Sequence, residues 1–504
     1  MRQVGRRLGK SGAGRQRLGR RSGDEQRNQQ RQHDGQFITP TYPHEPRALS
    51  RVVIIGLDGL EPSLALTRFA GELPVLQSLV TKARLASCEP PITVPAWACM
   101  VTGVDPGMLG LYGFHDRSAW DYRSRRLASS HALTEPPLWA LANRAGLRAR
   151  IIGVPPTYPA PALDGALISC FLTPDEEAIF THPESLGPEV RRHGYVFDTP
   201  EFRVAEDAKA DLKVDIERMI ERRFALAREW LRKDDWDLFM MVEMGSDRAH
   251  HAFWRYLDPA HPEHIPGHAL ASAIRDIYRR IDQELGRALE LLRPDDRLLV
   301  VSDHGACGMY GGFAINDWLA ANGFLTLVPE ARGRFSPELV DWSRTTAWAD
   351  GGYVGRIHIN QRGREPQGIV GAEAVPGVLE AIRSTPAPTA LRFAAPSAIY
   401  RATHGHAPAL QVEASDLHVR CLASVGHDSL LVASNDTGPD DANHGRNGVV
   451  LSNMALALDT PASLYDIAPT ALAWLGIARP PTFIGRNLAS PQRHSMVLPT
   501  SRAQ

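Results

Sequence analysis

The sequence has few cysteines, no long apolar run and almost no net charge. Its five cysteines are spread over 504 residues without a CxxC pair, which argues against a disulfide scaffold and against a thiolate zinc site. No run of about 18 apolar residues is present, so no transmembrane helix is predicted. The net charge of −1 gives no case for a nucleic acid or an anionic membrane as a partner. The composition is otherwise that of a soluble globular chain.

Apolar residues are also scarce in residues 1–47, which are rich in arginine, glycine and glutamine. Such a segment cannot bury a core, so we expect a disordered basic tail there and a second flexible tail over 491–504. A basic arm that binds nucleic acid or an acidic partner is the alternative interpretation. No apolar stretch follows the arginines, so no secretory or twin-arginine signal is expected and the predicted location is cytoplasmic.

Strand-like and helix-like segments alternate from residue 51 onward. The β-branched run 51–57 predicts a buried strand, and 297–305 predicts another. Apolar residues at spacings of three and four predict a helix over 214–233, and we interpret 73–89 as a helix as well. This alternation predicts an α/β fold with a mostly parallel central sheet flanked by helices on both faces.

The pattern loosens between residues 311 and 435, where shorter segments are interrupted by turn-forming residues. We expect an inserted cap or subdomain there, with the main core formed by 48–310 and 436–490. Three aromatic residues of this insert could stack on a base, although packing in a core is the favoured interpretation for each: Trp318, Trp348 and Tyr353.

Three acidic residues come at the ends of strand-like segments: Asp58, Asp247 and Asp303. Ligands of open α/β sheets bind beyond the carboxyl ends of the strands, so we expect these carboxylates to meet in one crevice. An aspartate at a strand end also caps the helix that follows, and for each residue taken singly the two interpretations stay open.

Three histidines favour a metal site over helix caps. His251 follows Asp247 by four residues, which on a helix places both side chains on one face. His304 comes directly after Asp303, and His444 is expected in a glycine-rich loop. Three carboxylates and three imidazoles without a thiolate suit Zn²⁺ and also Mn²⁺ or Fe²⁺. Six ligands are too many for one open site, so two divalent metal ions are predicted.

The uncharged segment 90–103, PPITVPAWACMVTG, offers two threonine hydroxyls. Two metal ions can clamp the oxygens of a displacement at phosphorus, and a hydroxyl beside them can become the nucleophile. Thr93 suits this role, because we expect it in a loop before a helix that starts near Pro95, whose first amides would bind a phosphoryl group. Thr102 comes at the end of that helix, beside Gly103, and is interpreted as structural.

These motifs together resemble the alkaline phosphatase superfamily, in particular the type I phosphodiesterase/nucleotide pyrophosphatase family and its bacterial predicted phosphohydrolase/phosphomutase branch. The resemblance covers residues 50–490 and rests on ordered motifs that include IIGLDGLEPS, PPITVPAWACMVTGVDPG, GSDRAHHAFW, VVSDHGACGMYGGFAINDWL and NHGRNGVVL. Each motif alone is weak evidence, whereas the ordered set is specific.

The resemblance implies an alkaline phosphatase-like catalytic core and a hydrolase of phosphoric ester, phosphodiester or pyrophosphate bonds. The implied substrate is a small-molecule phosphoester, with nucleotides among the candidates. The implied ligands of the first metal are Asp58, Asp303, His304 and Thr93, and those of the second are Asp247, His251 and His444. Thr93 would attack phosphorus, and water would then hydrolyse the phosphothreonine intermediate.

Other functions stay open from the sequence. A phosphomonoesterase or a phosphomutase of the same superfamily is the first alternative, although the mutase type of site uses serine where this chain has Thr93. A sulfatase is disfavoured, because Thr93 and Trp97 stand where its modified residue and its arginine would be. An inactive relative that acts as a binding protein is disfavoured by competent residues at all the implied positions. A nucleic-acid-binding protein is disfavoured by the near-neutral chain.

Overall fold

The computed structural model describes residues 50–199, 201–434 and 437–489. The predicted tails at 1–47 and 491–504 lie outside these residues. Within the described ranges, no helix has both the length and the apolar content needed to cross a membrane.

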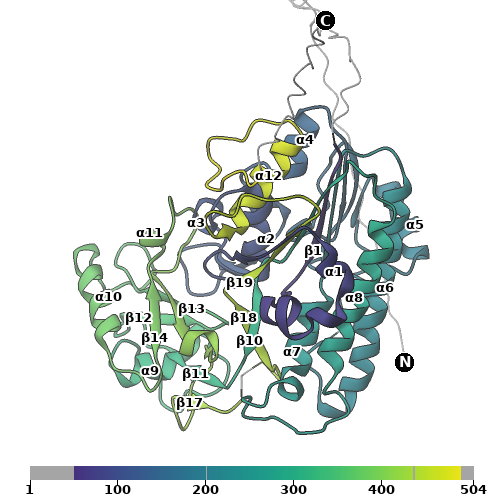
Figure 1. The fold of residues 1–504 in the computed structure, drawn as a ribbon. Coiled ribbons are helices and arrows are strands. Elements are labelled where there is room, and N and C mark those ends of the chain that lie inside the picture. Colours follow the sequence, from purple (N-terminus) through teal and green to yellow (C-terminus); the bar gives the residue numbers. More distant parts are fainter. Residues whose placement is uncertain (1–49, 200, 435–436, 490–504) are drawn as a thin grey trace, which may run out of the picture. The chain divides into compact units, whose positions relative to one another are not determined.

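A nine-stranded sheet forms the centre of the described chain, and most of its neighbouring strands are parallel (Figure 1). Parallel strands that are buried on both faces need continuous apolar runs, which the sequences VVIIGL and LFMMVE supply at its centre. This sheet confirms the predicted α/β fold. Its strands follow one another in the order β20 (Ala462–Ser463), β2 (Thr81–Ala86), β19 (Asn447–Ser452), β9 (Arg297–Val301), β1 (Val52–Leu57), β8 (Leu238–Glu243), β5 (Ala149–Ile152), β6 (Gly165–Ile168) and β7 (Thr181–His182).

Helices cover both faces of this sheet, as predicted (Figure 1). Successive residues of β1 point to opposite faces, so Val53 packs in one apolar cluster and Val52 in the other. The first cluster includes residues of α1 (Pro74–Ser78), α6 (Lys209–Arg232), α7 (Gly245–Leu257) and α8 (Ala273–Leu289). The second includes residues of α2 (Thr93–Thr102), α4 (Leu138–Arg144) and α12 (Ile467–Trp474). Two short helices are α3 (Pro106–Leu109) and α5 (Gly187–Arg192).

The predicted helix over 73–89 is wrong in its second half. The segment forms α1 and then strand β2, which pairs antiparallel with β19. Within β2, Thr81 and Leu85 are buried while Lys82 and Arg84 are exposed, which is the alternation of a strand. The partner strand β19 comes near the other end of the chain, so the pairing that favours a strand is not visible in the local sequence.

The predicted insert 311–435 contains a four-stranded antiparallel sheet and several short elements. Trp318 and Trp348 are fully buried in its apolar cluster, as predicted. The division of the chain into core and insert stays a prediction. The strands of the antiparallel sheet are, in order, β12 (Ala347–Asp350), β13 (Gly355–Ile359), β15 (Leu410–Ala414) and β14 (Leu391–Ala394). The other elements are β11 (Gly312–Ala314), β16 (Arg420–Leu422), β17 (Leu431–Val432), α9 (Ile315–Ala321), α10 (Val375–Ser384) and α11 (Pro396–Ile399).

Two further pairs of strands lie outside the central sheet. Strands β3 (His115–Arg117) and β4 (Arg125–Leu127) form one antiparallel pair. Strands β10 (Gly305–Gly308) and β18 (Ala442–Gly445) form the other, which brings a segment that follows β9 against one that precedes β19.

Candidate functional site

The first group of predicted ligands lies at the carboxyl ends of the neighbouring parallel strands β1 and β9. Asp58 directly follows β1, and Asp303 and His304 follow β9. All three side chains are fully buried, and one ligand atom from each lies within 4.8 Å of the others. The Nε2 atom of His304 is 3.3 Å from Asp303 Oδ2 and 3.6 Å from Asp58 Oδ1. The structure therefore brings these predicted residues together.

Two carboxylate oxygens of this group have no hydrogen-bond partner among the described residues, Asp58 Oδ1 and Asp303 Oδ2. Burial raises the pKa of both carboxyls well above the ordinary value, and repulsion from neighbouring carboxylates adds to it. A buried carboxylate oxygen that no donor faces costs free energy unless a cation compensates it. This donor set therefore fits a divalent metal ion.

The second group combines residues of a helix and a strand. Asp247 and His251 are one turn apart on α7, and His444 joins them from β18. The Oδ1 atom of Asp247 is 3.3 Å from His251 Nε2 and 3.7 Å from His444 Nε2. Burial would raise the pKa of Asp247, but His251 and Arg248 together hold that pKa well below its ordinary value. An ionised carboxylate between two imidazoles is again a metal-binding arrangement.

Two local predictions about this group are wrong, although its members meet as expected. Asp247 lies in the first turn of α7 rather than at a strand end, and His444 lies on β18 rather than in a loop. Gly445 pairs with Gly305 at the start of β10, and this pairing carries His444 to His304. The two imidazole rings stack with centroids 3.7 Å apart, so the two ligand groups are in contact.

The histidines are oriented by hydrogen bonds at their Nδ1 atoms. His304 Nδ1 lies 2.8 Å from the carbonyl oxygen of Gly305, and His444 Nδ1 lies 2.8 Å from that of Pro91. A carbonyl oxygen only accepts, so each Nδ1 donates and each Nε2 keeps its lone pair for a metal. Burial lowers the pKa of His304 to about 4 and that of His444 well below its ordinary value, so both rings are neutral at neutral pH.

His251 has a carboxylate partner that the sequence analysis missed. Its Nδ1 lies 2.7 Å from Asp440 Oδ1, and the hydroxyl of Tyr353 donates to Asp440 Oδ2 at 3.0 Å. The Tyr353 ring stacks on His251 with centroids 5.4 Å apart, so it lies at the site rather than in the core of the insert as predicted. The sequence DDANHG could have indicated Asp440 as a residue of the site, since its two acidic residues come shortly before His444.

Thr93 lies beside the first group. It is the first residue of α2, and its Oγ1 atom is 3.2 Å from His304 Nε2. The predicted loop position is therefore wrong, because the helix starts at Thr93 rather than near Pro95. Proline is tolerated in the first helical turn, where the amides have no partner within the helix. One turn further, Trp97 donates its Nε1–H to Asp58 Oδ2 at 2.6 Å and ties the helix to the first ligand group.

The other threonine of this segment is separated from the site by the length of α2. The hydroxyl of Thr102 donates to the carbonyl oxygen of Ala98 at 2.6 Å, and the residue is fully buried. Gly103 ends the helix with a φ of 67°, a left-handed conformation that favours glycine. The structural interpretation of Thr102 is therefore confirmed.

A cavity of about 500 Å³ opens onto Thr93 and onto all three residues of the second group. This volume lies in the range of small-molecule sites. Tyr353 and several arginines form other parts of its wall, and Phe114 and Phe171 contribute apolar surface.

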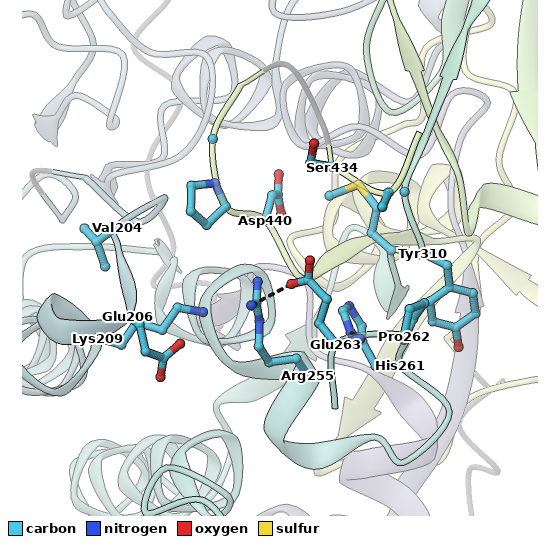
Figure 2. A pocket seen from close by; sticks show the side chains of 15 residues that line it. Val204, Glu206, Lys209, Arg255, His261, Pro262, Glu263, Tyr310, Ser434 and Asp440 are labelled. Atoms are coloured by element: carbon cyan, nitrogen blue, oxygen red, sulfur yellow. Dashed lines mark hydrogen bonds and ion pairs between the residues drawn. The ribbon is translucent and has the colours of Figure 1, made fainter. Parts of the chain in front are cut away.

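A second cavity, of about 380 Å³, is lined by Asp440 together with residues such as Arg255 and Glu263 (Figure 2). Figure 2 shows Arg255 beside Glu263, and their closest atoms are 2.6 Å apart. Arg255 also donates to Asp441, as does Lys209. The carboxylates of Glu263 and Glu206 lie on the same wall as these cations, and the cavity contains none of the predicted site residues.

A family model for type I phosphodiesterase/nucleotide pyrophosphatase matches residues 52–440. No curated protein matches the chain. Human ectonucleotide pyrophosphatase/phosphodiesterase 5 has a similar structure, with a TM-score of 0.52 and 14% sequence identity over 87% of this chain and 97% of that protein. Phosphonoacetate hydrolase from Sinorhizobium meliloti 1021, solved with phosphonoformate, has a TM-score of 0.56 and 14% identity over 85% and 96%. At this identity the two structures support the fold alone.

The family match spans most of the chain and includes every predicted site residue except His444, which lies just beyond it. The members of the family are hydrolases of phosphodiester and pyrophosphate bonds, so the chain is an enzyme of this class. It belongs to the type I phosphodiesterase/nucleotide pyrophosphatase family.

Proposed function

We propose that the chain hydrolyses phosphodiester or pyrophosphate bonds of small molecules through a phosphothreonine intermediate on Thr93. The observation that supports this most directly is the position of Thr93 Oγ1, 3.2 Å from His304 Nε2 and on the wall of a cavity shared with the second ligand group. Two groups of buried ligands, the first of them with carboxylate oxygens that no donor faces, support two divalent metal ions as cofactors. Their mixed nitrogen and oxygen donors favour Zn²⁺, with Mn²⁺ or Fe²⁺ as alternatives.

Each ligand group would hold one ion. The proposed ligands are Asp58, Asp303, His304 and Thr93 for the first, and Asp247, His251 and His444 for the second. When bound, such ions lower the pKa of a neighbouring hydroxyl and neutralise charge on phosphoryl oxygens.

The chain itself supplies the nucleophile and its orientation. Thr93 Oγ1 attacks phosphorus in line with the leaving group, so a new P–O bond forms as the bond to the leaving oxygen breaks. Water then attacks the phosphothreonine, which restores the Thr93 hydroxyl and releases the phosphorylated product. Thr93 begins α2, and the first amides of a helix have no partner within the helix, so they favour the phosphoryl anion at this position.

The first experiment compares substrates on metal-loaded protein. Bis-4-nitrophenyl phosphate should be hydrolysed with a kcat/KM at least about 10-fold above that of 4-nitrophenyl phosphate, a difference of about 1.4 kcal/mol in transition-state stabilisation. A strong preference for the monoester would instead support the phosphomonoesterase or phosphomutase alternative. Phosphonoacetate is a third substrate to test, because one structural neighbour is named for its hydrolysis.

The second experiment tests the nucleophile and the ions. Thr93→Ala should lose turnover, and rapid acid quenching of the wild type should trap phosphate on the peptide that contains Thr93. Thr102→Ala is the matched control, because it removes a buried hydroxyl from the same helix and should keep turnover. Elemental analysis should find two ions per chain in the wild type, and one fewer in Asp58→Asn and in Asp247→Asn. Full activity of Thr93→Ala would overturn the assignment of the nucleophile.

A further inference from the structure

The wall of the cavity that Thr93 and the second ligand group share contains more arginines than carboxylates. Four arginines line it, whereas its carboxylates are Asp247, a proposed metal ligand, and Asp198. Asp198 accepts two hydrogen bonds from Arg248, at 2.8 and 2.7 Å, so this pair is internally satisfied. The other three arginines are Arg203, Arg356 and Arg420.

Two of these arginines flank Tyr353, next to the second ligand group. Arg203 donates from Nη2 to the Tyr353 hydroxyl at 3.1 Å, and the Arg420 guanidinium lies 4.8 Å from the centre of the Tyr353 ring. Both also face Asp440, with Arg203 Nε at 3.2 Å and Arg420 Nη1 at 4.0 Å from its Oδ2 atom. Asp440 borders the other cavity and does not line this one, so the carboxylate lies behind the guanidinium groups.

Arg356 is held in the same manner on another part of the wall. Its Nη1 donates to Asp116 at 2.9 Å and to the carbonyl oxygen of His115, and its Nη2 lies 3.7 Å from Asp350. Neither Asp116 nor Asp350 lines the cavity. A guanidinium carries five N–H donors in a rigid fork, so a carboxylate behind it fixes its orientation while other donors serve a ligand.

We propose that this cavity selects phosphoesters whose group beyond the reacting phosphorus carries a second negative charge, a carboxylate or a phosphate. The reacting phosphoryl group is served by Thr93 and the proposed ions, which leaves Arg203 and Arg356 for another anion. Phe114 and Phe171, whose rings pack edge to face with centroids 6.0 Å apart, give apolar surface for the organic part between the two charges. The inference rests on the proposed function for the position of the reacting phosphorus.

The test uses three diesters that all release 4-nitrophenolate, so that the leaving group is constant. Their second ester group is phenyl, 3-carboxyphenyl or 3-phosphonophenyl. For the metal-loaded wild type we expect kcat/KM to be about 10- to 100-fold higher for at least one charged diester than for the phenyl diester, since hydrogen bonds to charged groups have about this effect. The carboxyphenyl and phosphonophenyl arms show which anion is preferred.

Variants assign the preference to the arginines. Arg356→Gln and Arg203→Gln should each lower kcat/KM for the charged diester about 10-fold more than for the phenyl diester, and Arg356→Lys should restore part of the difference. Arg125→Gln is the matched control, because Arg125 donates to the same Asp350 at 2.8 Å but does not line the cavity. Equal kcat/KM for charged and neutral diesters in the wild type, or an equal loss for both in the variants, would overturn the inference.

A binding measurement separates this inference from the proposed function. Calorimetry on Thr93→Ala gives the dissociation constants of the same diesters without turnover. If the wild type hydrolyses none of the diesters, while a charged diester binds more tightly than the phenyl diester, the proposed function is refuted and the anionic subsite is kept. Turnover of all three without any preference in rate or in binding would refute the subsite and keep the proposed function.

Discussion

Replacing Gly56 by alanine should destabilise the chain and weaken its metal centre. Gly56 lies in β1, two residues before Asp58. A β-carbon on Gly56 would lie 2.4 Å from Trp97 Cη2 and 2.8 Å from Val242 Cγ2, and both neighbours are fully buried. Such overpacking costs about 1–3 kcal/mol of unfolding free energy. Because Trp97 also donates to Asp58, a displaced indole should lower the affinity of the first ligand group for its ion.

The assay combines urea unfolding with competition against a chelator. Gly56→Ala should unfold at a lower urea concentration than the wild type and lose its ions at a lower chelator concentration. Gly377→Ala is the control, since a β-carbon there would meet nothing within 4 Å. Gly377 lies in α10, where alanine is favoured over glycine by up to about 1 kcal/mol, so this variant should be unchanged or slightly more stable.

A double-mutant cycle with Trp97→Phe tests the cause. Phenylalanine lacks the outer indole atoms that the new methyl group would meet, so Gly56→Ala should cost clearly less in that background. The reasoning is refuted if Gly56→Ala unfolds at the urea concentration of the wild type. It is also refuted if the alanine is equally costly with tryptophan and with phenylalanine.

Three further predictions concern the ions, the partner of His251 and the pH dependence of stability. Removing the ions with a chelator should lower the midpoint of thermal unfolding, since an ion at 100 times its Kd stabilises by about 2.7 kcal/mol; an unchanged midpoint would argue against bound ions. Asp440→Asn should weaken binding at the second ligand group about 10- to 100-fold, measured by competition with a fluorescent chelator, and wild-type affinity would contradict this. Burial raises the pKa of Asp116 to about 6, against about 4 when unfolded, so its contribution to stability is full below about pH 4 and is lost as pH rises through 6. Asp116→Asn should therefore gain about 2 kcal/mol of unfolding free energy relative to the wild type between about pH 4 and pH 7, and a constant difference would contradict the shift.

The ligands that could be predicted from sequence are those whose local pattern also determines their position. Asp58 and Asp303 follow short apolar runs, and parallel strands with such runs place their carboxyl ends at one edge of the sheet. Asp247 and His251 are four residues apart, and helical geometry alone puts them on one face. Asp247 was expected at a strand end and lies in a helix, but its spacing of four residues to His251 still predicted that the two would bind together.

The features that the sequence did not predict depend on partners far away in the chain. His444 lies on a strand because β18 pairs with β10, which comes more than a hundred residues earlier. The glycines next to His444 in the sequence favour a loop instead. The roles of Asp440 and Tyr353 follow from contacts with His251 across the fold, and neither residue belongs to a periodic pattern. Side-chain partners of this kind are set by packing rather than by propensity.

The position of β19 between β9 and β2 has a consequence for how the enzyme is made. Synthesis begins at the N-terminus, so β1, β8 and β9 emerge from the ribosome long before residues 442–452. Until that stretch arrives, β9 has an unpaired edge, β2 has no partner strand and the second ligand group has no His444. Unpaired edges are templates for wrong pairing. We therefore expect a chain that stops before residue 442 to sediment as aggregates, rather than to form a smaller folded protein.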